Sequence, residues 1–292
     1  WHWLHIPVGY LYCIGNPRAD WCFSTRPDAG LHDRSIAYPR GKVLGGSSAI
    51  NGMIYMRGQK QDYDYWASLG NAGWAWDDIL PLFRDFENHH RGNNEWHGAN
   101  GELRVESQRL RWDILDAFRA AAAQAGIPSI DDFNRGDNEG SAYFEVTQKK
   151  GLRFSAAKAF LHPVKSRKNL TILTNATSDR IVFEGKRARG IQYFINGKLF
   201  QANSASELVL SAGAIGSVQI LQRSGIGAAS FLNKLQIPVI HNAPEVGKNL
   251  QDHLQLRMIY KVSGVTTLNK MMRSPLQKAW MGMQFALFRK GP

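Results

Sequence analysis

Residues 41–58 read GKVLGGSSAINGMIYMRG, and this stretch decides how the rest of the chain is interpreted. Gly45 and Gly46 permit a tight turn with close backbone approach, because glycine tolerates positive φ. Ser47 and Ser48 add hydroxyls that can cap a following helix, whose free N–H groups favour an anion. The pattern therefore predicts a short strand, a turn and a helix that cradle a phosphate or a cofactor. An ordinary structural helix cap explains the same residues equally well.

A second junction of this kind lies at residues 207–227, ELVLSAGAIGSVQILQRSGIG. A strand is expected to run into Ala212 and Gly213, and a helix is expected to follow. Strand, turn and helix in this order bring a backbone against a dinucleotide. The alternative is a buried strand–helix unit that needs Gly213 only for packing.

The segments around these junctions mix the two kinds of secondary structure. Helical patterns are expected at 60–69, 76–90 and 111–126, a hairpin over 141–155, and four strands with short turns over 169–214. No internal repeat or low-complexity tract occurs, which argues against a solenoid. The sequence predicts an α/β or α+β protein.

Composition limits the classes of function. The chain has 292 residues, 43% of them hydrophobic, and can bury a sizeable core, which excludes a disordered protein. Residues 1–149 hold 15 basic and 19 acidic side chains, and residues 150–292 hold 21 and 5, so the net charge of +12 is all C-terminal. Such asymmetry favours an anionic partner. The basic residues are scattered singly without an aromatic stacking platform, and we expect no nucleic-acid partner.

Membrane contact is left open by residues 270–290, which lack acids and are rich in Met, Trp and Phe. They could lie on a membrane surface, or they could form a Met-rich core helix with basic ends. No apolar stretch is long enough to span a bilayer. Two cysteines, Cys13 and Cys22, fit a reducing compartment. We predict a cytoplasmic location, with peripheral contact at the inner membrane as an open alternative.

Two histidine patterns are candidates for chemistry. His89, His90 and His97 cluster, but they are expected in a Gly- and Asn-rich loop without i, i+4 spacing, and we predict no metal site. Asp252 and His253 could form an acid/base pair, yet adjacent residues rarely face the same site. A structural role for that histidine is the preferred interpretation.

Read together, the two junctions resemble the signatures of the glucose–methanol–choline (GMC) family of FAD-dependent alcohol oxidoreductases. Residues 41–64 resemble the first signature without a visible departure. Residues 213–227 resemble the second, with Val218 where the family usually has Ser or Pro. The resemblance to the family continues through the segments RGQKQDYDYWASLGNAGW, HGANGELRV and VGKNLQDHL. It therefore covers essentially the whole chain. Within the family, the sequence resembles the bacterial choline-dehydrogenase-like members in particular.

The resemblance implies an FAD-binding, Rossmann-like α/β domain interleaved with an α+β substrate domain on an antiparallel sheet. It divides the chain into an FAD-binding part with a lid (1–99), a substrate part (100–165), a second FAD-binding part (166–255) and the start of a second substrate part (256–292). The family's N-terminal dinucleotide fingerprint is not in this sequence, and its catalytic His pair is expected beyond Pro292. We therefore expect an internal fragment that contains no catalytic residue and is inactive alone.

The resemblance also assigns FAD contacts residue by residue. The residues implied at the diphosphate and ribityl region are Gly45, Gly46 and Ser47. Those implied at the flavin ring are Asn51, Gly52 and Ile54. Those implied at the adenosine end are Ser178, Ala212 and Gly213. Some members attach FAD covalently through a His just before the Asn; Ile50 stands there, and non-covalent FAD is expected.

The activity implied is oxidation of choline or another primary alcohol. A base outside this chain would remove the alcohol proton while hydride passes to the flavin N5, and oxygen or a quinone would accept the electrons. Two alternatives stay open. A hydroxynitrile lyase of the same fold keeps FAD without net redox chemistry, and a basic interaction module would have no activity.

Overall fold

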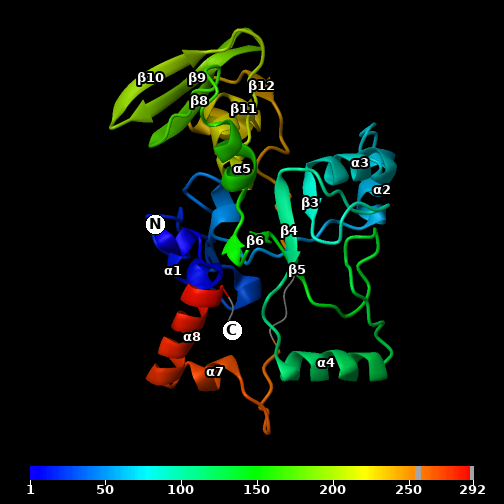
Figure 1. Cartoon of the computed structure of the whole chain (residues 1–292). Coiled ribbons are helices and arrows are strands. Elements are labelled where there is room, and N and C mark those ends of the chain that lie inside the picture. The colour runs from blue at the N-terminus through cyan, green and yellow to red at the C-terminus, as the bar shows by residue number, and fades with distance from the viewer. Residues whose placement is uncertain (254–257, 290–292) are drawn as a thin grey trace. The chain divides into compact units, whose positions relative to one another are not determined.

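The computed structural model of the chain describes residues 1–253 and 258–289, which divide into two compact units (Figure 1). Unit 1 comprises Trp1–Leu170 and Lys261–Pro292, and unit 2 comprises Thr171–Tyr260. The expected domain boundary between residues 255 and 256 lies outside the described residues. The division into FAD-binding and substrate domains stays a prediction.

Unit 1 is built from short helices and short strands joined by long loops (Figure 1). Its helices are α1 (Tyr10–Cys13), α2 (Lys60–Ser68), α3 (Trp76–Phe86), α4 (Asp113–Gln124), α7 (Leu268–Met271) and α8 (Pro275–Phe288). Its strands are β1 (Phe23–Ser24), β2 (Ala37–Tyr38), β3 (Glu87–His89), β4 (Leu103–Ser107), β5 (Glu145–Val146), β6 (Gln148–Lys149) and β7 (Leu152–Arg153). In the sheet β3–β4–β5, β3 is parallel to β4 and β4 is antiparallel to β5. The pairs β1–β2 and β6–β7 are antiparallel.

Local sequence explains the helices that position this sheet. Asp62 in α2 and Asp78 in α3 each accept the N–H of the residue before the helix, at 2.8 and 3.2 Å. A carboxylate in the first turn satisfies a free N–H and complements the helix dipole. The helices expected at 60–69 and 76–90 are confirmed, although the second ends at Phe86, where the chain enters β3.

Unit 2 holds an antiparallel sheet covered by a helix. Its strands are β8 (Ala176–Glu184), β9 (Arg187–Ile195), β10 (Lys198–Asn203), β11 (Ile226–Gly227) and β12 (His241–Asn242), and its helices are α5 (Gly213–Arg223) and α6 (Ala229–Lys234). The sheet order is β10–β9–β8, and β11 pairs with β12 in parallel. Helix α5 lies against β8, where the Oγ of Ser224 accepts the amide of Ile181 at 2.8 Å. Ile181, Ile220 and Leu232 are buried here.

Two expected strands are wrong. Residues 42–46 form none, because the left-handed Gly45 leads directly into a 3-10 helix, Gly46–Ala49, and the longer helix expected after this turn is also wrong. Residues 207–211 pair with no strand in the described part of the chain, and Val209 is 77% exposed. A strand requires a neighbour for its N–H and C=O groups, so an apolar run alone does not make one. The region 169–214 thus has three strands where four were expected.

The observed mixture of helices, strands and antiparallel sheets agrees with the predicted fold class. Within residues 1–253 and 258–289, no helix combines the length and the apolar character needed to cross a bilayer.

Candidate functional site

The first signature forms a glycine turn with open space on one side. Gly45 and Gly46 both have positive φ, +92° and +53°. A Cβ on Gly45 would lie 3.2 Å from the Cβ of Ala157, and one on Gly41 would meet the carbonyl oxygen of Gly46 at 2.1 Å. Nothing described lies within 4 Å of a Cβ built on Gly46 or Gly52. The turn therefore requires glycine and leaves room for another molecule beside its backbone.

The other side of this turn is anchored in a small core. Ala49 and Ile50 pack with Cys13 and Ala19, and Ile50 is only 3% exposed. Ser47 closes the base of the turn, since its Oγ accepts the N–H of Gly41 at 3.1 Å. The predicted residues Asn51, Gly52 and Ile54 are exposed. The segment thus presents these three residues outward on a fixed base.

A strap formed by residues 147–156, which include β6 and β7, holds the segment in place. The amide of Thr147 donates to the carbonyl of Met53 at 2.8 Å. The amide of Ala156 donates to the Oγ of Ser48 at 2.9 Å. These bonds join residues about a hundred positions apart in the chain, and they hold the segment at two points, Ser48 and Met53.

Sequence reasoning missed Arg153, which lies in the same strap. Its side chain is fully buried, and its Nη1 donates to the Ser48 carbonyl at 3.2 Å and to Asn51 Oδ1 at 2.8 Å. Its Nε and Nη2 have no hydrogen-bond partner among the described residues. Burial lowers the pKa of Arg153 to about 10, so it is still charged at neutral pH. No local sequence signal marks an arginine in this strap as buried.

The three predicted residues of unit 2 do not lie together. Ala212 and Gly213 form the start of α5, and both are exposed. Ser178 lies on β8, and its neighbour Asp179 pairs with Arg223 at the far end of α5. Ile181 of the same strand also contacts this end of the helix, through Ser224, whereas Ala212 and Gly213 lie at its start. A role for these residues toward one ligand stays a prediction.

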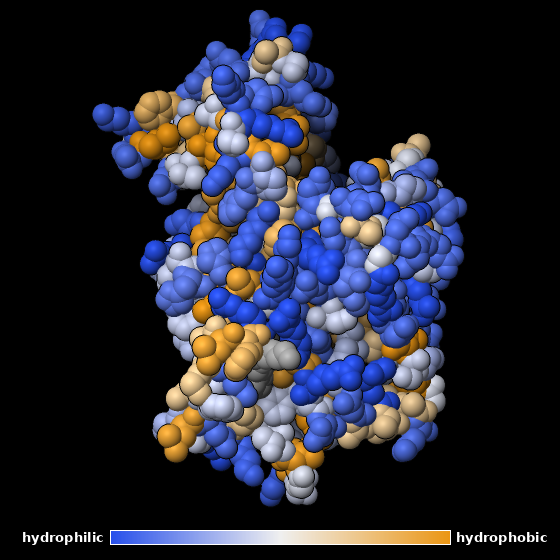
Figure 2. All heavy atoms as spheres, viewed as in Figure 1, coloured by the Kyte–Doolittle hydropathy of each residue, from blue (hydrophilic) through white to orange (hydrophobic). Residues whose placement is uncertain are grey.

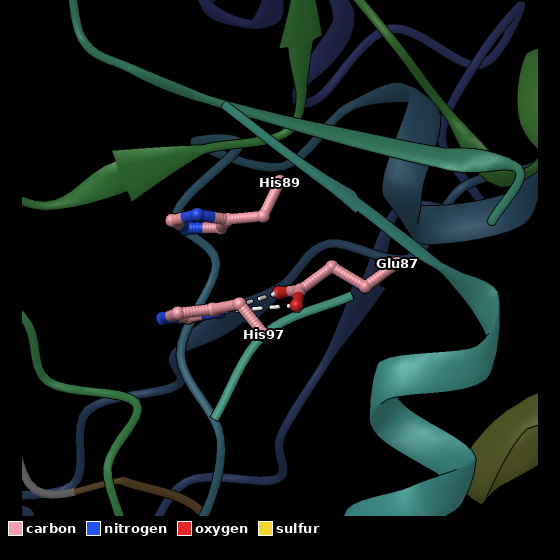
Figure 3. Close-up of side chains that lie close together, drawn as sticks. All are labelled: Glu87, His89 and His97. Carbon is pink, nitrogen blue, oxygen red and sulfur yellow. Dashed lines mark hydrogen bonds and ion pairs between the residues drawn. The ribbon is translucent and has the colours of Figure 1, made fainter. Parts of the chain in front are cut away.

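A second cluster in unit 1 is buried and charged. The rings of His89 and His97 stack with centroids 3.6 Å apart, and the carboxylate of Glu87 lies beside His97 (Figure 3). His97 Nδ1 is 3.0 Å from Glu87 Oε2, and its Nε2 is 2.8 Å from Asp132 Oδ2. Arg57 Nη2 lies 2.9 Å from Glu87 Oε2 without hydrogen-bond alignment, which makes this contact an ion pair. We call these five residues, with Glu145, the histidine–carboxylate network.

The expectation that His89 lies in a loop is wrong. His89 is the last residue of β3, where it pairs with Val105 of β4, and its Nε2 is 2.9 Å from Glu145 Oε2. Parallel pairing of β3 with β4 sends the intervening loop back over the sheet, and this return places His97 on His89. The spacing of the histidines along the chain gave no signal of this ring stacking.

The network contains donor atoms close enough to one another to hold a metal ion, and in the structure these atoms pair with each other. Burial by itself would lower the pKa of His97, yet hydrogen bonds to Asp132 and Glu87 and their charges raise that pKa to about 9. In this pairing His97 is an imidazolium that donates from both nitrogens, to Glu87 and to Asp132. Burial would raise the pKa of Asp132, and the bonds from His97 and from the Asn134 amide lower it to about 2. The cluster is a buried ion network that ties loop 131–134 to β3.

Comparison with known proteins places this geometry in a family. Residues 18–255 match the family model described as GMC oxidoreductase. The chain belongs to the GMC oxidoreductase family. The GMC signature of residues 41–64 therefore forms the glycine turn described above, and the resemblance seen in the sequence is confirmed.

Curated relatives of this GMC chain are choline and alcohol dehydrogenases. Human mitochondrial choline dehydrogenase is 39% identical over 282 residues, covering 97% of this chain and 47% of that protein. Oxygen-dependent choline dehydrogenase of Pectobacterium atrosepticum is 43% identical, covering 87% and 46%. Alcohol dehydrogenase [acceptor] of Pseudomonas putida is 38% identical, covering 91% and 49%. The GMC chain thus spans about half the length of the curated relatives it matches.

Solved structures give the same fold for this GMC chain. An FAD-dependent oxidoreductase from Chaetomium thermophilum matches with a TM-score of 0.88 and 27% identity, covering 100% of this chain and 53% of that one. Pyridoxine 4-oxidase from Mesorbium loti matches with a TM-score of 0.77 and 30% identity, covering 83% and 48%. These matches confirm the predicted fold class.

Proposed function

We propose that this GMC chain provides FAD-binding residues of an FAD-dependent alcohol oxidoreductase. The observation that carries the proposal is the glycine turn of residues 45 and 46, fixed by core and strap on one side and open on the other. A backbone without Cβ atoms lets a dinucleotide approach closely. The buried cation of Arg153, which has no anionic partner among the residues described, adds positive charge next to this turn. Open space and positive charge suit an anionic cofactor such as FAD.

The residue roles follow the family signature. Gly45, Gly46 and Ser47 would hold the diphosphate and ribityl region, and Asn51, Gly52 and Ile54 would line the flavin ring. Ser178, Ala212 and Gly213 of unit 2 would bind the adenosine end. Bound FAD supplies the hydride acceptor for the alcohol carbon. The chain's own part is to bind and orient the cofactor, while the proton-accepting base is expected outside it.

The substrate and acceptor are proposed from the relatives. Those relatives are named choline dehydrogenase and alcohol dehydrogenase, which supports choline or another primary alcohol as the substrate and favours redox chemistry over the lyase alternative. Oxygen or a quinone would accept the electrons. The location we propose for the protein is the cytoplasm.

The decisive test mixes the natural protein that contains this chain with choline or benzyl alcohol without oxygen and follows flavin absorbance. Bleaching supports an alcohol oxidoreductase. A flavin that stays oxidised, in a protein that releases aldehyde when a cyanohydrin is supplied in a parallel assay, identifies a lyase. Absence of flavin identifies an interaction module.

Peripheral membrane contact would use α8. Leu276, Trp280, Leu287 and Phe288 of this helix are exposed, and apolar side chains gather over it (Figure 2). No acidic residue follows Asp252 in the sequence, so attraction to anionic lipid is unopposed locally. We expect the natural protein to sediment with phosphatidylserine vesicles at low salt and to be released at high salt. No sedimentation at low salt would remove the membrane assignment.

The glycine turn gives a mutational prediction. Gly45→Ala should weaken FAD affinity about tenfold or more, equivalent to ~1.4 kcal/mol, because a left-handed alanine is strained and its Cβ meets Ala157. Gly185→Ala is the matched control: Gly185 is also left-handed, at φ +57°, with nothing within 4 Å. It should cost about 1 kcal/mol of stability and leave FAD affinity unchanged. Titration of each apoprotein variant with FAD measures its affinity. Equal losses of affinity in the two variants would contradict the assignment of Gly45 to the FAD site.

The attachment of the flavin gives a second prediction. The position of the covalent His in some family members is Ile50, which is buried among apolar side chains. Ile50 has no atom that could bond the flavin, so acid precipitation of the natural protein should leave the yellow colour in the supernatant. Flavin that stays in the washed pellet would show a covalent bond at another residue.

A further inference from the structure

The strap places one buried arginine directly beneath the segment proposed to line the flavin. Arg153 lies on β7, and its main chain is fixed from both sides: its amide donates to the His5 carbonyl at 2.9 Å, and its carbonyl accepts from Lys158 Nζ at 2.8 Å. The guanidinium is thus held at a fixed depth under Asn51. A side chain this constrained can determine the orientation of a neighbour.

The neighbour whose orientation it determines is the amide of Asn51. Asn51 Oδ1 accepts two hydrogen bonds, from Arg153 Nη1 at 2.8 Å and from the Met53 amide at 2.9 Å. An amide nitrogen cannot accept either bond, so the two donors exclude the flipped amide. Nδ2 of Asn51 is then directed away from them, and it bonds to no residue that the structure describes. The side-chain atom that Asn51 has left to offer is therefore a donor, not an acceptor.

The rest of the guanidinium argues for a role beyond packing. Its Nε and Nη2 are buried and have no hydrogen-bond partner in residues 1–253 and 258–289. A buried charge without a carboxylate is costly, and a hydrophobic residue of similar volume would avoid that cost. Met or Leu could fill the space, but neither could hold the Asn51 amide.

We propose that Arg153 is a positioning residue that locks Asn51 with its Nδ2 donor toward the bound flavin. This inference rests on the proposed function, in which residues 45–54 bind FAD. A donor facing the ring stabilises the negative charge that the ring gains on reduction. Arg153 itself need not touch the cofactor, because it acts through Asn51.

The experiment compares four variants of the natural protein by FAD titration and by the midpoint potential of the bound flavin. Arg153→Met and Asn51→Leu should each weaken FAD affinity about tenfold and make the potential more negative. The double variant should be no worse than Asn51→Leu alone, because the two residues form one unit. Arg153→Lys, which keeps the charge but not the planar fork, should fall between wild type and Arg153→Met.

The matched control is Arg119, another arginine with a buried, unpartnered Nε, whose Nη2 donates to Ser129 Oγ and the Ile130 carbonyl. Arg119→Met should leave both flavin measurements at the wild-type value. Additive effects of Arg153→Met and Asn51→Leu, or an unchanged potential in Arg153→Met, would overturn the positioning role. If Arg153→Met fails to fold, Arg153→Lys and Asn51→Leu decide: an unchanged potential in both overturns it. A wild-type protein that binds no FAD would instead reject the proposed function.

Discussion

Replacing His97 with alanine should lower the free energy of unfolding by about 3–5 kcal/mol. His97 is 1% exposed and lies between two buried carboxylates, those of Glu87 and Asp132. Alanine would leave Asp132 without an ionic partner from the network and leave Glu87 with Arg57 alone. Uncompensated buried charge is among the largest sources of destabilisation in single variants.

Urea unfolding of the natural protein, followed by tryptophan fluorescence, measures this loss. The control is Arg189→Gln, which breaks the exposed ion pair of Arg189 with Glu184 on β8 and β9. Exposed pairs contribute little because water screens them, so the midpoint should hardly move. A His97→Ala variant as stable as Arg189→Gln would show that the network is not what ties loop 131–134 to β3.

The sequence predicted the glycine turn better than the strands around it. Positive φ at Gly45 and Gly46 is a local property of glycine, and a local pattern suffices to predict it. The expected strand at 207–211 depends on a neighbour that the pattern cannot supply. The Leu- and Val-containing run was correctly seen as apolar, but Val209 has no strand to pack beside in the part of the chain described.

The contacts of the charged groups show more clearly what a local sequence pattern cannot predict. His97 meets Glu87 and Asp132, which are 10 and 35 positions away, and Arg153 meets Asn51 across 102 positions. Histidine spacing rules apply along one helix or strand, whereas here the loop between β3 and β4 sets the contacts. Such contacts are determined by topology, and topology was available only through the family resemblance.

The stability of the protein should fall between pH 6.5 and pH 9 because of the same histidine. The pKa of His97 rises from its ordinary value of 6.5 to about 9 in the folded chain. Below pH 6.5 both states hold the proton, and the stabilisation is complete. As the pH rises to 9, the unfolded state loses the proton first, so stability decreases until the folded state loses it too. A pKa raised from 6.5 to about 9 corresponds to a contribution on the order of 3 kcal/mol.

At acid pH, the carboxyl group of Asp132 changes the stability in the opposite direction. The pKa of Asp132 falls from 3.8 to about 2 on folding, so its contribution is present above pH 3.8 and is lost as the pH falls toward 2. The stabilisation from His97 and Asp132 together is therefore greatest from about pH 4 to 6.5.

Urea midpoints measured from pH 5 to 9.5 should decline above pH 6.5 in the wild type and stay nearly level in His97→Ala. Asp132→Asn removes one of the two carboxylates that raise the pKa of His97, so its decline should end at a lower pH than in the wild type. An equal alkaline decline in His97→Ala would mean that another group titrates there and that His97 is not the cation holding the two carboxylates.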